Sequence, residues 1–177
     1  MPPVPSESRF RLYMAISLDG YVADAEGGID WLNDFETGVD YGTDAFMAEV
    51  DTLIMGRVTF DQILSFGAWP YAGKRVAVLT SRPIADAPEG VEGTSDLAGL
   101  IAELREERSQ VWIVGGPAAV DACRAMGALD TVDLFVMPVL LGAGIPLFGF
   151  EADPLPLTLL EAATFESGVV SLKYEVE

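Results

Sequence analysis

Histidine is absent from this sequence of 177 residues, and cysteine occurs once, as Cys123. Without histidine the chain cannot build a Ser-His-Asp or Cys-His nucleophilic centre, and it lacks the commonest metal ligand. A single cysteine allows neither an internal disulfide nor a Cys-x-x-Cys pair. We therefore expect a protein of the reducing cytoplasm that binds no metal, and any chemistry that it performs should be carried by a cofactor.

Positive charge is also scarce. The chain has 10 lysine and arginine residues against 28 aspartate and glutamate residues, and its formal net charge is −18. Such a surface repels nucleic acid and anionic membranes, so we expect neither as a partner. No apolar run approaches the roughly 18 residues of a membrane-spanning helix. The first nine residues have no basic or apolar signal-peptide segment, so we predict a flexible tail at 1–9 and a single domain at 10–177.

The few cations gather in one stretch, between residues 52 and 85. The only acid in this stretch is Asp61. Its positively charged residues are Arg57, Lys74, Arg75 and Arg82. Because the stretch is interleaved with apolar segments, it indicates a site for an anionic ligand, and a chance cluster of surface cations is the alternative.

Strand-like and helix-like segments alternate along the chain. Continuously apolar segments are typical of strands covered on both faces, and apolar residues at helical spacing indicate amphipathic helices. We predict strands at 10–17, 52–55, 75–80, 110–114 and 131–139, helices at 41–50, 59–66, 96–108 and 117–126, and a closing hairpin at 157–166 and 169–177. Right-handed crossovers then give an α/β fold of three layers. It has a central, mostly parallel mixed sheet of eight or nine strands, helices on both faces and a C-terminal antiparallel hairpin.

Ligands of such sheets bind beyond the carboxyl ends of the strands. Three segments are expected there: Met55-Gly-Arg, Leu79-Thr-Ser-Arg and Val114-Gly-Gly. Glycine lets the backbone approach a phosphate closely, and a helix that follows offers unpaired N–H groups and the positive end of its dipole. Arg57 and Arg82 add forked guanidinium donors. Two arginines and neighbouring hydroxyls suit an added 2′-phosphate, which favours NADP over NAD.

Four segments resemble the ordered motifs of dihydrofolate reductase and, more closely, the reductase domain of riboflavin biosynthesis, the RibD C-terminal superfamily. They are Ala15-Ile-Ser-Leu-Asp-Gly-Tyr-Val, Met55-Gly-Arg-Val-Thr-Phe, Leu79-Thr-Ser-Arg-Pro and Val114-Gly-Gly-Pro. Ser17-Leu-Asp-Gly and Pro138-Val-Leu-Leu-Gly-Ala-Gly resemble the second branch. The resemblance implies a dihydrofolate-reductase-like fold, NADPH as cofactor and a homodimer. It also implies hydride transfer to a C=N or C=O of a small heterocyclic or sugar-derived substrate, similar to that of 5-amino-6-(5-phosphoribosylamino)uracil reductase.

The same resemblance assigns residues to the cofactor and to the substrate. The implied cofactor contacts are Ala15, Ile16, Val22 in a mobile closing loop, Gly56, Arg57, Val58, Thr59, Leu79, Thr80, Ser81, Arg82, Gly115, Gly116, Pro117, Ala118 and Ala119. The implied substrate side comprises Trp31, Lys74, Pro138, Leu141 and Gly142. The peptide between Gly115 and Gly116 is often cis in this fold, which would store strain at the cofactor site.

Two carboxylates are candidate catalytic acids. Asp19 follows the strand end that should meet the nicotinamide, and burial beside the cofactor would raise its pKa, whereas a simple turn aspartate is the alternative. Asp44, like Asp40, lies near the position of the pterin-binding carboxylate of dihydrofolate reductase, with helix capping as the alternative. Lys74 and the Met137-Pro138 pair depart from the folate-binding pattern. A dihydrofolate reductase and a non-catalytic NADP-binding protein are the alternative functions.

Overall fold

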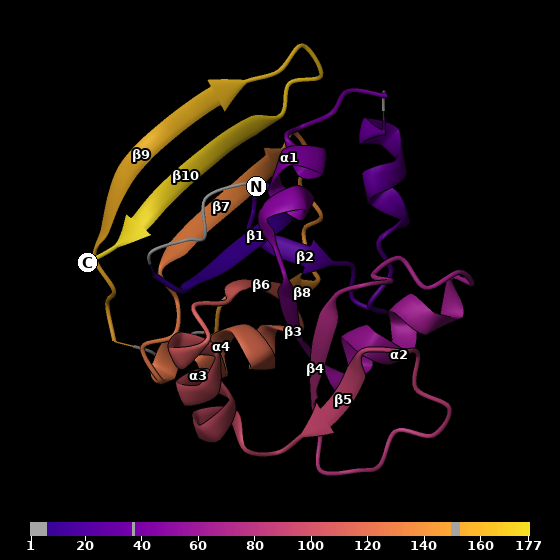
Figure 1. The fold of residues 1–177 in the computed structure, drawn as a ribbon. Coiled ribbons are helices and arrows are strands. Elements are labelled where there is room, and N and C mark those ends of the chain that lie inside the picture. Colours follow the sequence, from indigo (N-terminus) through magenta and orange to yellow (C-terminus); the bar gives the residue numbers. More distant parts are fainter. Residues whose placement is uncertain (1–6, 37, 150–152) are drawn as a thin grey trace.

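Eight strands form the central sheet in the order β5-β4-β3-β6-β1-β7-β10-β9 (Figure 1). The computed structural model describes residues 7–36, 38–149 and 153–177. The strands of this sheet are β1 (Arg9–Ser17), β3 (Thr52–Gly56), β4 (Arg75–Leu79), β5 (Val91–Thr94), β6 (Gln110–Gly115), β7 (Thr131–Met137), β9 (Leu157–Thr164) and β10 (Val170–Val176). A separate small sheet pairs β2 (Tyr21–Ala23) with β8 (Ile145–Pro146). The helices are α1 (Thr43–Glu49), α2 (Arg57–Ser65), α3 (Leu97–Glu106), α4 (Pro117–Ala125) and a 3-10 helix, η1 (Asp30–Phe35).

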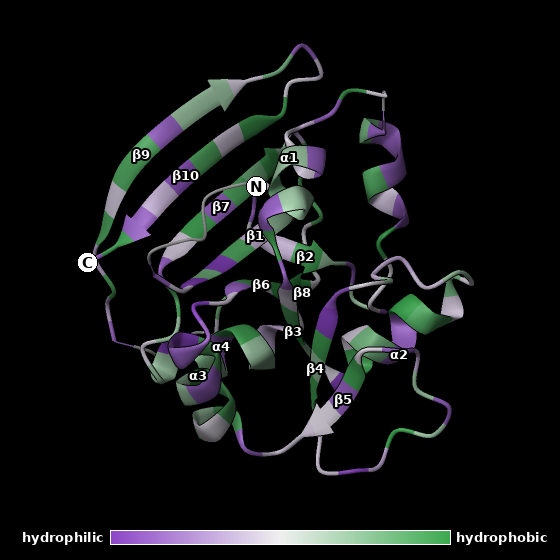
Figure 2. Ribbon diagram, in the orientation of Figure 1, coloured by the Kyte–Doolittle hydropathy of each residue, from purple (hydrophilic) through white to green (hydrophobic). Residues whose placement is uncertain are grey.

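The sheet is parallel over most of its width. β1 lies between β6 and β7, with Leu12 beside Ile113 on one side and beside Val132 on the other. The hairpin at the C-terminal end adds β10, which runs antiparallel to both β7 and β9. Along β10, apolar and polar residues alternate (Figure 2), as in a strand with one covered face. The predicted mixed sheet and its closing hairpin are therefore confirmed.

Helices cover both faces of the sheet, and successive side chains of each strand point alternately toward one helix layer and the other. Phe10 and Leu12 of β1 belong to a core that includes Leu104 of α3 and residues of α4. Tyr13 follows Leu12 in β1 and points to the opposite face of the sheet. There it packs in a second core with Phe46 of α1 and with residues of α2. Leu104 is fully buried, and burial of a leucine side chain contributes about 1.5–3 kcal/mol. Two cores of this kind explain why the central strands are apolar on both sides.

Four short elements were not predicted, and pairing with neighbouring strands explains three of them, β5, β2 and β8. β5 has the sequence Val-Glu-Gly-Thr, which carries little apolar pattern, but it lies in parallel register with β4, Val91 beside Val76. β2, β8 and η1 lie outside the strands and helices that the sequence predicted. None of the helices in the three described ranges has the length and apolar character needed to cross a membrane.

The start of the domain also differs from the prediction. β1 begins at Arg9, and Ser8 before it is buried, with its hydroxyl accepting a hydrogen bond from Arg105 Nη1 at 3.1 Å. The predicted tail at 1–9 is therefore too long at its C-terminal end. Its residues 1–6 lie outside the described residues.

Candidate active site

The three predicted phosphate-binding segments lie next to one another. β4, β3 and β6 are consecutive strands of the sheet, with Gly56 beside Leu79 and Met55 beside Gly115 at their carboxyl ends. A Cβ added to Gly116 would lie 3.1 Å from Thr59 Oγ1 and 3.6 Å from the Gly56 Cα. The starts of the two helices that follow β3 and β6 therefore approach each other so closely that a side chain at Gly116 would fill the space between them.

Helices α2 and α4 both direct their N-termini toward this edge. Gly56 is the N-cap of α2 and Gly116 the N-cap of α4, and neither makes a side-chain capping bond. Gly116 has φ of 78°, which favours glycine. The peptide between Gly115 and Gly116 is trans, so the expectation of a strained cis bond is wrong. Helix N-termini leave N–H groups available for an anion. In α4 this donor is the N–H of Ala118, because Pro117 has no N–H and the Ala119 N–H donates to the Gly116 carbonyl at 2.8 Å.

Arg57 and Arg82 lie at this edge of the sheet and differ in the bonds that their guanidinium groups make. Arg57 Nε donates to Asp61 Oδ1 at 2.8 Å, and its Nη1 donates to the Pro83 carbonyl at 3.3 Å, so the guanidinium is held against the loop after β4. In that loop the Arg82 backbone N–H donates to Thr80 Oγ1 at 3.1 Å. The Arg82 guanidinium makes no hydrogen bond or ion pair within the part of the chain that the structure describes, and the residue is exposed. These residues fit a phosphorylated dinucleotide.

The other half of the predicted basic stretch lies elsewhere. Lys74 precedes β4 and sits at the amino edge of the sheet, where its Nζ donates to the carbonyls of Met47 at 2.8 Å and Val50 at 2.6 Å. Arg75 forms ion pairs with three glutamates: Glu92, Glu103 and Glu107. Lys74 therefore ties the end of α1 to β4, and this contradicts its predicted contact with substrate. The basic stretch divides between the two edges because it spans a whole strand.

Asp19 holds two loops together at the carboxyl edge. Its Oδ1 accepts a hydrogen bond from Ser17 Oγ at 2.6 Å, and its two oxygens accept from the backbone N–H groups of Leu141 at 3.1 Å and Gly142 at 2.8 Å. The bond from Ser17, with those from the backbone, lowers the pKa of this solvent-exposed carboxyl. The condition set for a catalytic acid, burial with a raised pKa, is therefore not met in this structure, because the carboxylate is exposed and accepts hydrogen bonds from three donors.

The nicotinamide-side residues lie at the end of β1. Ala15 and Ile16 are its last residues before Ser17, and Ile16 is buried. Val22, predicted in a mobile loop, lies in β2, which is paired with β8. The Gly20 carbonyl also accepts a hydrogen bond from the Leu147 N–H at 3.0 Å. The loop is thus attached to the segment that contains the predicted substrate residues Leu141 and Gly142.

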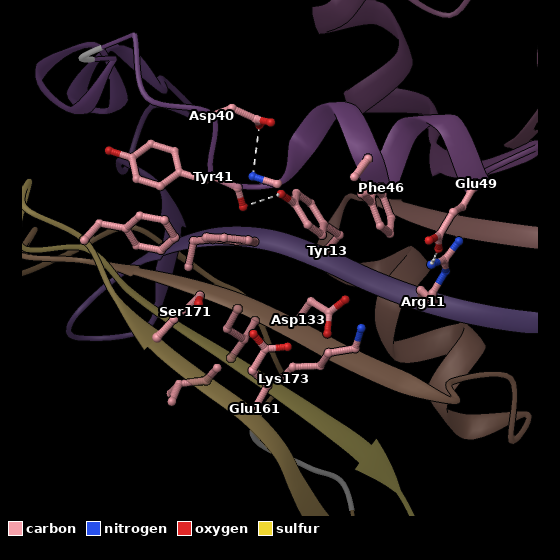
Figure 3. Close-up of a pocket in the computed structure, with 17 residues that line it drawn as sticks. Arg11, Tyr13, Asp40, Tyr41, Phe46, Glu49, Asp133, Glu161, Ser171 and Lys173 are labelled. Carbon is pink, nitrogen blue, oxygen red and sulfur yellow. Dashed lines mark hydrogen bonds and ion pairs between the residues drawn. The ribbon is translucent and has the colours of Figure 1, made fainter.

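A half-open cavity of about 400 Å³ lies between α1 and strands β1, β7, β10 and β9 (Figure 3). Tyr13 is central to it, and its hydroxyl lies 3.2 Å from Thr43 Oγ1 and donates to the Tyr41 carbonyl at 3.4 Å. Tyr13 and Ala15 are on the same face of β1, and two residues along a strand span about 7 Å. The cavity is therefore adjacent to the position predicted for the nicotinamide.

Of the two acids considered at the first helix, the cavity is lined by Asp40. Asp40 Oδ1 accepts from the N–H groups of Gly42 at 2.9 Å and Thr43 at 2.8 Å, which is the capping role given as its alternative. Asp44 lies in the first turn of α1 and is exposed. Trp31, on η1, is half-buried against Phe135 and its neighbours. The structure thus places Asp40 at the cavity rather than Asp44, and brings Trp31 to the same side of the sheet.

Two buried charged residues at the cavity were not predicted. Arg11 and Asp133 are 6% and 8% exposed, on neighbouring strands β1 and β7. Arg11 Nη1 pairs with Glu49 Oε2 at 2.6 Å, and its guanidinium carbon lies 4.8 Å from the centre of the Phe46 ring. Burial raises the pKa of Asp133, against the lowering effects of Lys173 and Arg11. Charged residues inside otherwise apolar strands were the signal that could have identified them.

Comparison with known proteins identifies the family. The model of the RibD C-terminal domain matches residues 71–171 of the chain. The chain belongs to the RibD C-terminal domain family. An uncharacterized protein of Bacillus subtilis (strain 168), YwjB, is 39% identical over 166 residues, which cover 92% of this chain and 95% of that protein.

Solved structures agree with this family and fold. A putative riboflavin biosynthesis protein from Shewanella sp. PV-4 is 30% identical with a TM-score of 0.83, over 96% of this chain and 99% of that chain. A diaminohydroxyphosphoribosylaminopyrimidine deaminase/5-amino-6-(5-phosphoribosylamino)uracil reductase from Thermotoga maritima has a TM-score of 0.69 at 17% identity. The match covers 97% of this chain and 57% of the Thermotoga chain, so the RibD C-terminal domain protein described here spans little more than half of that protein.

The RibD C-terminal fold thus brings most of the predicted cofactor residues to one edge. Val58, in the first turn of α2, is 82% exposed. Ala119 of α4 is buried, and its side chain lies close to Gly56. Pro117 occupies the first turn of α4 with Ala118 beside it. On the substrate side, Pro138 lies under the turn at Gly168, where an added Cβ would approach it to 3.3 Å. The other predicted cofactor and substrate residues were placed above, and among them Lys74 lies at the opposite, amino edge of the sheet.

Proposed function

We propose that this protein is an NADPH-dependent reductase that transfers a hydride to a C=N or C=O of a small heterocyclic or sugar-derived substrate. The observation that carries the proposal is the pair of adjacent helix N-termini at Gly56 and Gly116. Arg82 follows β4 at the same edge, and its guanidinium has no partner among the described residues. Membership of a reductase family supports the same reaction class. The name of the Shewanella structure supports a substrate of the riboflavin type.

Each group of the chain has a distinct task in this proposal. Backbone N–H groups after Gly56 and Gly116 would bind the pyrophosphate of NADPH. Arg57 and Arg82, with the hydroxyls of Thr80 and Ser81, would bind the 2′-phosphate. The backbone at Ala15 and Ile16 would orient the nicotinamide. The bound cofactor supplies the hydride, and the protein supplies position and exclusion of water.

The proton for this reaction has to come from water or from an acid other than Asp19. A carboxyl with a lowered pKa is ionised at neutral pH and holds no proton to donate. Asp44 stays a candidate from the sequence, although it is exposed. We therefore assign Asp19 to loop positioning and name water as the proton source in the proposal.

Fluorescence titration with NADPH and NADH tests the cofactor assignment. Arg82→Ala and Arg57→Ala should each weaken NADPH binding on the order of tenfold and leave NADH binding nearly unchanged, because only NADPH carries the 2′-phosphate. Arg9→Ala, at the exposed amino end of β1, is the matched control and should change neither affinity. If both arginine variants bind NADPH as the wild type does, the 2′-phosphate site is wrong. NADPH oxidation that depends on dihydrofolate would instead favour a dihydrofolate reductase.

We also propose a cytoplasmic homodimer. Support comes from β9, which is at the edge of the sheet and exposes Leu157, Leu159 and Leu160 by 41%, 53% and 48%. Exposed apolar edge strands are prone to pair with another chain. Light scattering at micromolar concentration should give twice the mass of one chain, and Leu159→Glu should shift the protein toward the monomer. A wild-type protein that stays monomeric at these concentrations contradicts the homodimer.

A further inference from the structure

The loop between β2 and η1 closes on itself through Asp24. The Oδ1 atom of Asp24 accepts hydrogen bonds from the N–H groups of Glu26 at 3.0 Å and Gly28 at 2.7 Å. The Asp24 N–H also donates to the Gly28 carbonyl at 3.0 Å, and the Gly27 N–H donates to the Asp24 carbonyl at 3.1 Å. Both glycines are required, because Gly27 has φ of 85° and a Cβ at Gly28 would lie 2.6 Å from Asp24 Oδ2. Residues 24–28 therefore form one compact unit, the Asp24 turn.

A side chain of α2 holds the Asp24 turn from outside. Gln62 Nε2 donates a hydrogen bond to the Gly27 carbonyl at 2.9 Å, and both residues are half-buried. No other hydrogen bond joins the turn to α2 among the described residues. Because the turn is closed by its own bonds, this single bond from α2 restrains all of it.

Gln62 lies near the end of α2 that faces the proposed cofactor site. It follows Val58 by four residues and Thr59 by three, so it lies one helical turn further along the same side of α2. Val58 and Thr59 are two of the expected cofactor contacts. The bond from Gln62 thus connects the helix that would bind the cofactor phosphates to the loop that contains Val22, the contact expected at the nicotinamide.

The beginning of the same loop is anchored on the other side. Asp19 accepts hydrogen bonds from two backbone N–H groups of the loop after β7, at 3.1 and 2.8 Å, and β2 is paired with β8. Val22 therefore lies between an anchor at Asp19 and an anchor at Gln62. The contacts of Asp19 do not involve α2, so loss of the Gln62 bond should free the Asp24 turn and leave the first anchor in place.

We infer that Gln62 is a positioning residue, which holds the Asp24 turn so that Val22 stays beside the end of β1, where the nicotinamide would bind. The inference rests on the proposed NADPH-dependent function. Gln62 acts through the turn and affects the nicotinamide half of the cofactor. The adenosine half is assigned to Arg82 and its neighbours, which make no contact with the turn in this proposal.

Hydrogen exchange of the cofactor-free protein, followed by mass spectrometry, tests the anchor. Gln62→Met keeps the length of the side chain and removes its donor. Loss of a neutral hydrogen bond should speed exchange in peptides that cover residues 20–29 by about three- to tenfold. Gln110→Met is the matched control, because Gln110 is the only other glutamine and its Nε2 donates to the Glu7 carbonyl at 2.9 Å, at the amino edge of the sheet. It should leave exchange at 20–29 unchanged, and a thermal melt verifies that both variants fold.

Titration with NADPH and with adenosine 2′,5′-bisphosphate tests what the anchor does, because the bisphosphate carries the 2′-phosphate but lacks the nicotinamide. Gln62→Met should weaken NADPH binding by about three- to tenfold, as the population of the anchored loop falls, and leave the affinity for the bisphosphate unchanged. Arg82→Ala, by contrast, should weaken both ligands, and Gln110→Met neither. Equal weakening of both ligands by Gln62→Met would overturn the inference, because it would show a general disturbance of α2.

Two further results would overturn the inference: exchange at 20–29 that is unchanged in Gln62→Met, or NADPH affinity that is unchanged in this variant. The outcome is separable from that of the proposed function. A wild type that binds NADPH as Gln62→Met does contradicts only the role of Gln62. A wild type that binds neither ligand contradicts the proposed function and the role of Gln62 toward the cofactor, whereas the exchange experiment decides the anchor by itself.

Discussion

Lys74→Met tests whether the first lysine of the chain is a structural residue. The ammonium group of Lys74 donates to the carbonyls of Met47 and Val50 at 2.8 and 2.6 Å, at the C-terminal end of α1. Helix ends leave carbonyls without intrahelical partners, and a cation there satisfies them and complements the helix dipole. Methionine keeps the length and apolar stem of lysine but removes all its donors.

The size of the effect follows from these two bonds. A hydrogen bond to a charged group contributes about 1.5–3 kcal/mol. Lys74 is half-buried, so water can replace part of each bond, and we expect a total loss of about 2 kcal/mol in the free energy of unfolding. In a domain of this size, each 1 kcal/mol lowers the midpoint of thermal unfolding by about 2–4 °C. The variant should therefore melt about 4–8 °C below the wild type.

Lys173→Met provides the matched control, because Lys173 is the only other lysine. No hydrogen bond of its ammonium group occurs within residues 7–36, 38–149 and 153–177, so its removal should lower the melting midpoint less. Calorimetry and urea unfolding of both variants give the comparison. The reasoning is refuted if Lys74→Met melts with the wild type, or if Lys173→Met is destabilised as much.

Three further predictions concern the rim and the cavity. Gly116→Ala forces a Cβ to 3.1 Å from Thr59 Oγ1 at a φ of 78°, so it should destabilise the fold by about 1–2 kcal/mol and weaken NADPH binding; equal affinity in a fluorescence titration would contradict the close approach. Because hydrogen bonds lower the pKa of Asp19 below 3.8, its contribution to stability is complete above that pH and is lost as the pH falls through the lowered value; Asp19→Asn should flatten this acid-side slope in urea unfolding, and an unaltered slope would refute the loop-positioning role. Because burial raises the pKa of Asp133 above 3.8, the folded state loses stability as the pH rises through the raised value; Asp133→Asn should therefore melt higher than the wild type at pH 7, and a lower midpoint would contradict the unmet charge.

The fold could be predicted because the side chains of each central strand are apolar on both faces, and each face is covered by a separate core. Residues such as Ile54 and Ala77 are buried in one core, while Leu53 and Val76 are buried in the other, so each strand is apolar throughout. β5 shows the limit of this reasoning. Its residues are half-buried or exposed, and it is a strand because β4 offers a free edge for pairing.

The candidate site was predictable where strand direction fixes position. Glycines and arginines that follow parallel strands must meet at one edge, which is what Gly56, Gly116 and Arg82 do. The same rule shows why the prediction for Lys74 failed. Lys74 precedes β4, so the direction of the strand places it at the opposite edge, whereas the prediction rested on the resemblance and on its charge.

The cavity was missed because β1 was interpreted as one apolar segment. Arg11 and Tyr13 occupy alternate positions on the face toward α1, and Asp133 occupies the same face of β7. An arginine or aspartate in the middle of a covered strand is costly unless it is paired. The sequence contained these residues, but only the register of β1 and β7 shows that they share one cavity.

The contacts of Asp19 connect the two halves of this site. The Leu18 N–H donates to the Val139 carbonyl at 2.9 Å, and the carboxylate of Asp19 binds the N–H groups of Leu141 and Gly142. Pairing of β2 with β8 extends the attachment along both loops. The loop expected over the nicotinamide and the loop expected beside the substrate therefore form a single bonded unit. A displacement of one loop must either move the other or break bonds that Asp19 makes, so cofactor and substrate contacts at this edge are mechanically linked.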